Sequence, residues 1–341
     1  VILAGTYQWS NLGMTDLSDL DIQQMIGRAG RPQYDTEGTA IIMCSEKNQR
    51  KYRDLINSTT TIESCLHEHL VEHINTEIGL RTITCLQEGE EWIKNSFLYI
   101  RIQQNPLHYR AILSLAGLEG HQWEKALFRL VEKSVEDLQG REMVEMQNID
   151  GTPEPQKLRN LSATIYGETM SSNCLSFKTM CCILDIPVKS SLEALLHALS
   201  NAHEYADLKL RNGEKLFYKK LSQDPEIRYQ LPNGASPTTA AHKVFIIVQM
   251  TLGNVDIEPY KQDLKQGAGG PALDSYQVFR LAPRICKAMA TVALQREDGK
   301  TLKNALHLTR IMSGKAWPGT SVIFRQIDAI GAKSIKVLGL K

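Results

Sequence analysis

One stretch of the sequence carries the most information: Gln24-Met25-Ile26-Gly27-Arg28-Ala29-Gly30-Arg31-Pro32. Its two arginines stand three positions apart among small residues, so both planar guanidinium groups can reach one polyanionic group while the glycines let the backbone approach. An isolated Arg-x-x-Arg pair is usually a solvated surface turn, but the full pattern is hard to obtain by chance. We therefore predict arginine-finger chemistry, in which Arg28 and Arg31 stabilise charge on a phosphate group.

The segments around this stretch alternate between strand and helix patterns. Residues 1–6 predict a buried strand, Leu17–Ile26 predicts a helix after a turn at 11–13, and Gly38–Cys44 predicts the next strand. This alternation is typical of an α/β domain. Because the first strand begins at the first residue, without an initiator Met or a signal peptide, we expect the chain to be the C-terminal part of something larger.

Helical patterns dominate from residue 45 onward. Ser45 is a candidate cap for a helix through Leu55, Thr60–Ile78 predicts a second helix, and a capping box of Thr84 and Gln87 opens a third that ends near residues 97–100. These helices predict a compact, winged-helix domain over residues 59–144. The polar residues 145–159 include two prolines and predict a linker.

The last part of the chain predicts a helical domain over residues 160–341. Its amphipathic segments are residues 160–166, 177–183, 191–203, 238–252, 276–295 and 301–317. The expected fold is therefore an α/β fragment followed by a mainly α part. Residues 322–334 are similar to the opening of a helix-hairpin-helix, which we interpret as a helical end-cap because Ala329 replaces its first glycine.

The composition excludes several classes of protein. Apolar residues make up 42% of the chain and charged residues 23%, and no apolar run approaches the ~18 residues of a membrane span, so no membrane contact is expected. Seven cysteines lie scattered, without Cys-x-x-Cys spacing, at positions 44, 65, 85, 174, 181, 182 and 286. This usage favours free thiols in a reducing compartment.

The near-zero net charge conceals a basic C-terminal block. Residues 276–341 hold 12 Lys and Arg against 3 Asp and Glu, whereas residues 1–275 hold 27 against 35. On a helix over 276–296, a polar arc beside the apolar face contains Arg280, Arg284, Lys287 and Thr291. This arc predicts contact with a nucleic-acid backbone, and the alternative is a solvated face. Pro283 predicts a kink or a later helix start, which puts Arg280 in doubt.

Several stretches resemble one family, the Ski-type DExH-box helicases of superfamily 2. Residues 24–35 resemble its motif VI, and residues 1–9 resemble the strand after motif V. Residues 63–78 and 97–101 are similar to its winged-helix domain. Tyr166 and residues 177–180, 211–215 and 240–243 are similar to its Sec-sixty-three-like helical domain. In the family, that domain contains a ratchet helix that lies along the translocating strand. Within the family, the likeness is greatest to the meiotic crossover helicases.

The resemblance implies an ATP-dependent DNA helicase of the nucleus that moves in the 3′ to 5′ direction and acts in meiotic recombination. It places Gln24, Gly27, Arg28 and Arg31 on ATP, with Arg28 and Arg31 catalytic, and it places Arg280, Arg284, Lys287 and Thr291 on the nucleic acid. ATP and Mg²⁺ are implied as cofactors of the full-length protein. Implied partners are single-stranded or branched DNA, the first RecA-like domain of the same protein and recombination proteins.

Two motifs needed for ATP hydrolysis are missing from the sequence. Asp298-Gly-Lys-Thr301 supplies only the tail of a phosphate-binding loop, and no DExH string occurs. We therefore expect this chain alone to be inactive. His69 and His73, with Glu72 between them, match the spacing of some zinc sites, but a third ligand is lacking and we predict no metal site.

Two alternatives remain open at this point. A spliceosomal RNA helicase has the same order of domains and also binds a backbone through charge. A helicase-derived scaffold, with an inactive nucleotide site, would keep the helical domain as a protein-docking platform. Intact phosphate-loop and DExH motifs in the preceding sequence would favour an enzyme over a scaffold.

Overall fold

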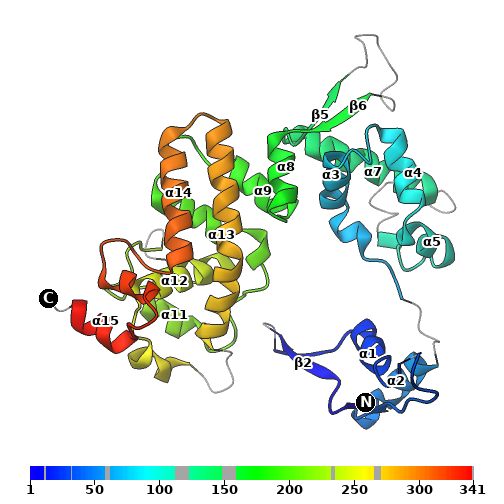
Figure 1. The fold of residues 1–341 in the computed structure, drawn as a ribbon, viewed down its shortest axis with the longest axis horizontal. Coiled ribbons are helices and arrows are strands. Elements are labelled where there is room, and N and C mark those ends of the chain that lie inside the picture. Colours follow the sequence, from blue (N-terminus) through cyan, green and yellow to red (C-terminus); the bar gives the residue numbers. More distant parts are fainter. Residues whose placement is uncertain are drawn as a thin grey trace. The chain divides into compact units, whose positions relative to one another are not determined.

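A computed structural model describes residues 1–10, 13–31, 33–57, 62–111, 123–147, 159–231, 235–264 and 270–339. The chain divides into two compact units, Val1–Ser64 and Cys65–Lys341, which we treat separately (Figure 1). None of the helices in these ranges combines the length and the apolar character that a membrane span requires.

The first unit is a small α/β structure. Strand β1 (Ile2–Leu3) pairs in parallel with β4 (Ile41–Ile42), and α1 (Asp19–Ile26) lies between them in sequence. Both strands are shorter than predicted, because Ile2 is 67% exposed and only Leu3 of β1 faces a core. An antiparallel hairpin of β2 (Tyr7–Ser10) and β3 (Gly13–Asp16) was not predicted.

The helices of this unit begin where polar side chains cap them. Ser18 precedes α1, and its hydroxyl accepts a hydrogen bond from the Asp21 backbone N–H. Ile22 then packs in a core with Leu3, Tyr52 and Leu55. The helix expected from Ser45 is split into the 3₁₀ turn η1 (Glu46–Asn48) and α2 (Gln49–Ile56), and the Ser45 side chain makes no cap.

The second unit begins with the winged-helix part. Its elements are η2 (Leu66–His69), α3 (Leu70–Gly79), α4 (Leu86–Lys94), α5 (Phe97–Gln104), α7 (Trp123–Gly140), β5 (Val144–Gln147) and β6 (Asn160–Ala163). The predicted third helix is two helices, because Ser96 caps a new one by accepting from the Tyr99 N–H. The predicted box also differs, since Glu88 rather than Gln87 accepts from the N–H and hydroxyl of Thr84.

A β-hairpin occupies both ends of the predicted linker. Strand β5 pairs antiparallel with β6, with Val144 opposite Ala163 and Gln147 opposite Asn160. Residues 145–147 and 160–163 are therefore strands, although the sequence predicted linker and helix there, because each strand is stabilised by the other across the hairpin. Residues 148–158 of that prediction lie outside the described part of the chain.

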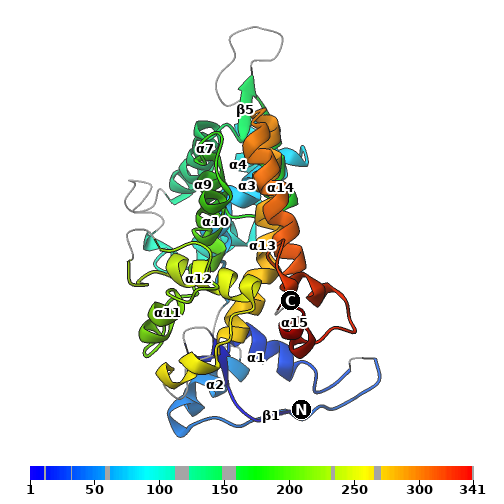
Figure 2. The same ribbon diagram turned by 90° about the vertical axis from the view of Figure 1, so that its left-hand side faces the viewer.

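The hairpin is followed by the helical part. Its elements are α8 (Ile165–Ser172), α9 (Phe177–Leu184), α10 (Leu192–Ser200), η5 (His203–Tyr205), α11 (Lys215–Leu221), α12 (Ala240–Gly253), η7 (Glu258–Asp263), α13 (Pro271–Gln295), α14 (Gly299–Gly314), η8 (Ser321–Gln326) and α15 (Ala332–Gly339). The mainly α character is confirmed. Helix α11 was not predicted. Helices α13 and α14 run side by side (Figures 1 and 2).

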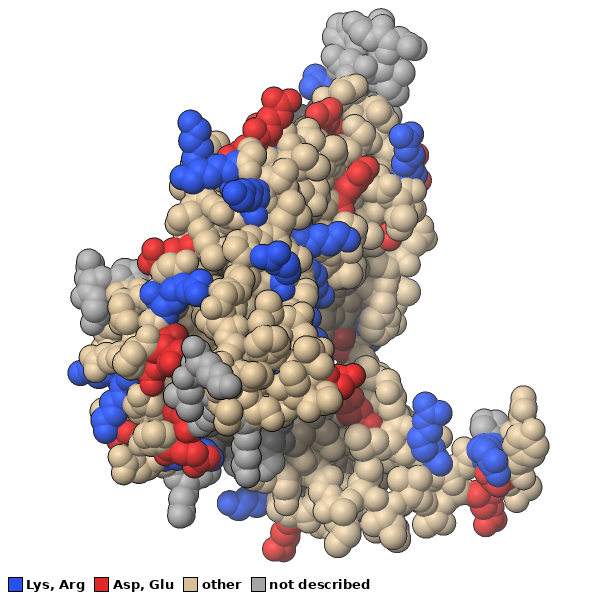
Figure 3. All heavy atoms as spheres, turned by 60° about the vertical axis from the view of Figure 1, so that its left-hand side comes forward, with Lys and Arg blue, Asp and Glu red and all other residues tan. Residues whose placement is uncertain are grey.

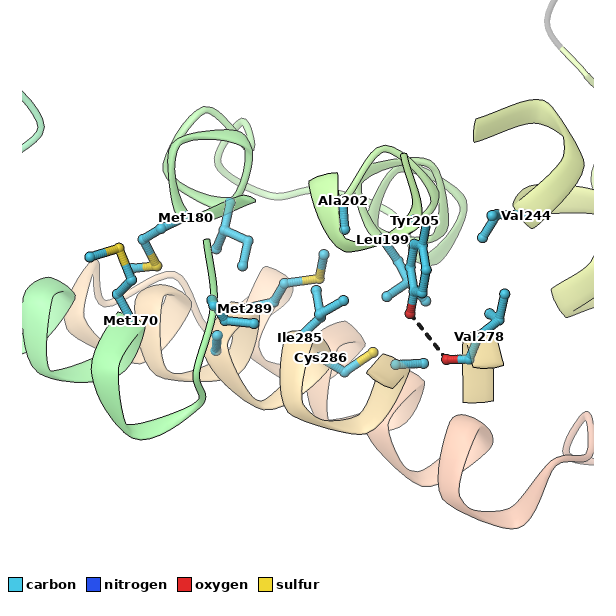
Figure 4. Packing of buried hydrophobic residues seen from close by; sticks show 14 of the residues in the cluster. Met170, Met180, Leu199, Ala202, Tyr205, Val244, Val278, Ile285, Cys286 and Met289 are labelled. Atoms are coloured by element: carbon cyan, nitrogen blue, oxygen red, sulfur yellow. Dashed lines mark hydrogen bonds between the residues drawn. The ribbon is translucent and has the colours of Figure 1, made fainter. Parts of the chain in front are cut away.

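Helix α13 forms the spine of the helical part. It continues through Pro283 without a break and starts at Pro271, so the doubt about Arg280 is removed. A proline at the first position suits a helix start, because the missing N–H has no intrahelical partner there. Its inner face packs on Met170, Met180 and other buried residues, and the Tyr205 hydroxyl donates to the Val278 carbonyl at 3.1 Å (Figure 4).

The winged-helix and helical parts join through close polar packing. The Asn75 side chain of α3 donates to the Gly167 carbonyl at 2.8 Å and to the Ser171 hydroxyl at 2.6 Å. A Cβ at Gly167 would lie 2.3 Å from the Met143 carbonyl oxygen, which is closer than atoms pack. Only glycine therefore lets α8 approach both Met143, the residue before β5, and the Asn75 side chain of α3.

The helical part contains a buried network of four charges. Lys243 of α12 lies 2.7 Å from Glu214 and 2.8 Å from Asp274 of α13, and these three side chains are 0% exposed. Arg211 lies 2.9 Å from Glu214 and 2.8 Å from Asp274. Two cations thus balance two carboxylates, which removes the penalty of an unpaired buried charge.

We predict that Lys243→Met lowers the free energy of unfolding by about 3 to 5 kcal/mol, because it leaves two buried carboxylates with one cation. The matched control is Lys261→Met, whose ion pair with Glu258 is exposed (51% and 71%) and should be worth about 0 to 1 kcal/mol. Urea unfolding followed by helical circular dichroism measures both. Equal stabilities of the two variants would contradict this role for the network.

Candidate nucleotide and nucleic-acid sites

The predicted nucleotide motif surrounds the C-terminal end of α1. Gln24 lies in the last turn of this helix, and Gly27 caps it with its N–H directed at the carbonyls of Gln23 and Met25. The turn continues, because the Arg28 N–H donates to the Met25 carbonyl at 3.2 Å. Gln24 and Arg28 are both exposed and stand one helical turn apart, on one side of the helix end.

Arg31 is held by its neighbours along the chain. Its Nε lies 3.4 Å from the Asp35 carboxylate, which also accepts from the Arg31 N–H at 2.9 Å, and its guanidinium lies 5.2 Å from the ring of Tyr34. The side chain is nevertheless 74% exposed. Among the described residues, no hydrogen bond occupies its two terminal nitrogens, so the forked end of Arg31 remains available to a phosphate.

Sequence reasoning missed a glycine that shapes this motif. A Cβ at Gly38 would lie 2.8 Å from the Ala29 carbonyl oxygen and 3.0 Å from the Gly30 nitrogen, whereas Gly27 has ordinary helical torsions and less need to be glycine. The strand region after the motif therefore packs directly on the backbone between the two arginines. Its only sequence signal was a glycine ahead of an apolar strand.

The predicted nucleic-acid residues share one face of α13. Arg280 and Lys287 are exposed, and Arg284 is half-buried, with its Nε buried and unpartnered. Thr291 is half-buried and its hydroxyl donates to the Lys287 carbonyl at 3.2 Å, so it is the least available of the four. This face is opposite to the packed face of the helix (Figure 4).

Two exposed apolar side chains lie on the same face of α13. Tyr276 is 63% exposed and Leu294 is 62% exposed, one turn before Arg280 and two turns after Lys287. An exposed aromatic ring beside cations suits the stacking of a nucleic-acid base. Sequence reasoning missed both residues, although each is an apolar residue out of phase with the buried face.

Comparison with known proteins finds two matching domain families in the second unit. A Winged Helix-turn-helix domain matches residues 63–148, and a Sec63 Brl domain matches residues 163–331. The first match ends beside β5 and the second starts at the end of β6.

Individual relatives match almost the whole chain. The ATP-dependent DNA helicase MER3 of Saccharomyces cerevisiae is 30% identical over 99% of this chain, and the probable ATP-dependent DNA helicase HFM1 of Mus musculus is 33% identical over 97%. Together, these matches fit the C-terminal part of a Ski-type helicase of superfamily 2. It spans 28% and 22% of the lengths of these two relatives. Activating signal cointegrator 1 complex subunit 3 of Mus musculus is 28% identical over 93% of the chain, which spans 14% of it.

The stretch Asp298–Thr301, which is similar to the tail of a phosphate-binding loop, caps the start of α14. The Asp298 carboxylate accepts from the Thr301 N–H at 3.1 Å at the start of α14 and from the Lys189 N–H at 2.6 Å. The Thr301 hydroxyl accepts from the Ser190 N–H at 2.9 Å. These side chains are used to join α14 to the loop before α10, as expected for a motif that is not a phosphate-binding loop.

The zinc-like spacing on α3 also has a structural use. The Glu72 carboxylate accepts from the Phe177 N–H at 2.8 Å and so satisfies the start of α9, while His69 and His73 are exposed. Among the residues that the structure describes, no group of three His, Cys, Asp or Glu side chains is placed to hold a metal ion.

We predict that the Asp298 cap makes stability depend on pH. Hydrogen bonding to Thr301 lowers the pKa of Asp298, so its contribution is complete above the unfolded pKa, about 3.9, and is lost as pH falls through the lower folded-state pKa. The melting temperature of the wild type should therefore fall more between about pH 5 and pH 2 than that of Asp298→Asn. The asparagine keeps a capping oxygen but has no charge to lose. Parallel pH profiles would show that this charge does not stabilise the fold.

Proposed function

We propose that this chain is the part of an ATP-dependent DNA helicase that supplies one side of the nucleotide site and a face for single-stranded DNA. The observation that carries the proposal is the motif at residues 24–31, with its free arginine fork, in one chain with a ratchet-like α13. Support comes from the names of the MER3 and HFM1 relatives, which are ATP-dependent DNA helicases. Action in meiotic recombination, in the nucleus and with recombination proteins, belongs to the same proposal.

In the nucleotide site, the chain's own groups would act on the phosphates. Residues 1–58 would form the C-terminal part of the second RecA-like domain. From there, the exposed amide of Gln24 and the guanidinium groups of Arg28 and Arg31 would approach the γ-phosphate. ATP and Mg²⁺ would be held mainly by the first RecA-like domain, because the phosphate loop and the acidic motif are not in this sequence. Asp35 would fix the Arg31 guanidinium before the nucleotide arrives, which limits the entropy lost on binding.

At the DNA face, binding would rest on charge and stacking. Arg280, Arg284 and Lys287 would follow the phosphates, and Tyr276 would stack on a base. The buried side of α13 holds this face firmly against the rest of the helical part.

Two other functions fit some of these observations. The likeness to activating signal cointegrator 1 complex subunit 3 gives some support to the alternative of a spliceosomal-type RNA helicase, but less than the MER3 and HFM1 relatives give to a DNA helicase. A scaffold without catalysis is less well supported, because Gly38 and Asp35 maintain the backbone and the side chain of a motif that a scaffold would not need.

We predict that Arg31→Ala in the full-length protein lowers DNA-stimulated ATP hydrolysis at least ~100-fold, or roughly 2.7 kcal/mol of transition-state stabilisation. Arg31→Lys should restore little, because an ammonium group lacks the planar fork. Steady-state ATPase assays measure both, with DNA binding in the absence of nucleotide as the control that should not change. The 341-residue chain alone is expected to be inactive. Near-normal turnover by Arg31→Ala would favour the scaffold.

We predict that Arg284→Ala with Lys287→Ala reduces the salt dependence of single-strand binding by up to ~0.7 of a log unit for each phosphate that the side chains no longer neutralise. Fluorescence anisotropy at several salt concentrations gives the slope. The control pair is Lys133→Ala with Lys178→Ala, which removes exposed cations from α7 and α9. An unchanged slope in a folded α13 variant would remove this face from the proposal.

A further inference from the structure

A second cluster of basic side chains lies on α14. Lys303, His307 and Arg310 fall on the side of this helix opposite the buried Ala305 and Leu308. Lys303 and Arg310 are exposed, and His307 is half-buried. In the space-filling view, Lys and Arg side chains gather on the face of the helical part that α14 presents (Figure 3).

A fourth basic side chain joins this cluster from a different segment. Arg228, between α11 and α12, places its guanidinium 4.4 Å from the ring centre of Trp317, just after α14. Burial lowers the pKa of His307, and the neighbouring Arg310, Arg228 and Lys303 lower it further. The surroundings of the imidazole are therefore positive, and three separate cations contribute.

Counter-charges are missing from this cluster within the described ranges. No carboxylate there lies within 4.0 Å of Lys303, Arg310 or Arg228, whereas Arg141, Lys220 and Lys261 each have one. In addition, the His307 Nε2 atom is buried and has no hydrogen-bond partner. Repulsion among Lys303, Arg310 and Arg228 is a cost in the free protein that a bound polyanion would relieve.

We propose that Lys303, His307, Arg310 and Arg228 form a second phosphate-binding surface, which holds a duplex arm of a branched nucleic acid while the single strand follows α13. Lys303 and Arg310 are separated by about 10 Å along the helix at 1.5 Å per residue, so they can contact two different phosphates of a backbone rather than one isolated anion. The Trp317 ring orders the Arg228 fork in advance.

An acidic protein fits this surface less well. Protein hot spots rely on exposed aromatic anchors set in a pocket, but Trp317 is only 2% exposed and lies beneath Arg228. The proposal rests on nucleic-acid binding by the Ski-type helicases, but not on translocation along α13, because the two surfaces use different helices.

The test compares three ligands with the 341-residue chain: a forked DNA with one duplex arm, a single strand alone, and polyglutamate. Lys303→Ala, Arg310→Ala and Arg228→Ala are combined in a triple variant. We expect fork binding to weaken about tenfold and its salt slope to fall by up to ~0.9 for each duplex phosphate that is no longer neutralised, with single-strand binding changed less than about twofold. The Arg284 and Lys287 variant should instead weaken the binding of both the fork and the single strand. The Lys133 and Lys178 control variant should change the binding of neither DNA.

Each other outcome overturns the proposal. Unchanged fork affinity and slope in a triple variant that melts like the wild type would remove the surface. Loss of polyglutamate binding with fork binding intact would assign it to an acidic protein. If the triple variant does not fold, Lys303→Gln with Arg310→Gln, which keeps long side chains at exposed sites, decides the question by the same measurements.

Discussion

The helical part depends on one interaction, the contact of the buried Lys243 ammonium with the carboxylates of Glu214 and Asp274. A charge without solvent is tolerated only when partners surround it, so α12, α13 and the segment before α11 are held in one arrangement. Arg211 completes the balance from the edge of the network. Helix α13, whose outer face we propose for DNA, is therefore held near its beginning by the directional ion pairs of Asp274 as well as by apolar packing.

The winged-helix and helical parts are also joined by buried polar groups. Asn75 reaches across to Gly167 and Ser171, and Glu72 satisfies the N-terminal end of α9. Polar groups that could have formed a metal site or a solvated face are therefore used in the junction. The faces of α13 and α14 that we propose for nucleic acid belong to the same compact unit, in which the two helices pack side by side.

The residues of the predicted nucleotide motif are held in place differently, because they are exposed rather than buried. Its geometry comes from local backbone contacts: the cap at Gly27, the approach of Gly38 and the hold of Asp35 on Arg31. Under the proposed function, such a half-site would be correctly shaped in this chain and would become active only when another domain delivers the phosphates.

The sequence by itself determined the features that depend on neighbours in the chain: the α/β beginning, the helical remainder and the arginine motif. These follow from periodicity and capping within a few residues. Only the tertiary structure decided the pairing of β5 with β6, the unbroken course of α13 through Pro283, the burial of Lys243 and the meeting of Arg228 with α14. Each of these joins segments far apart in sequence, and its free energy comes from a partner whose position no local pattern specifies.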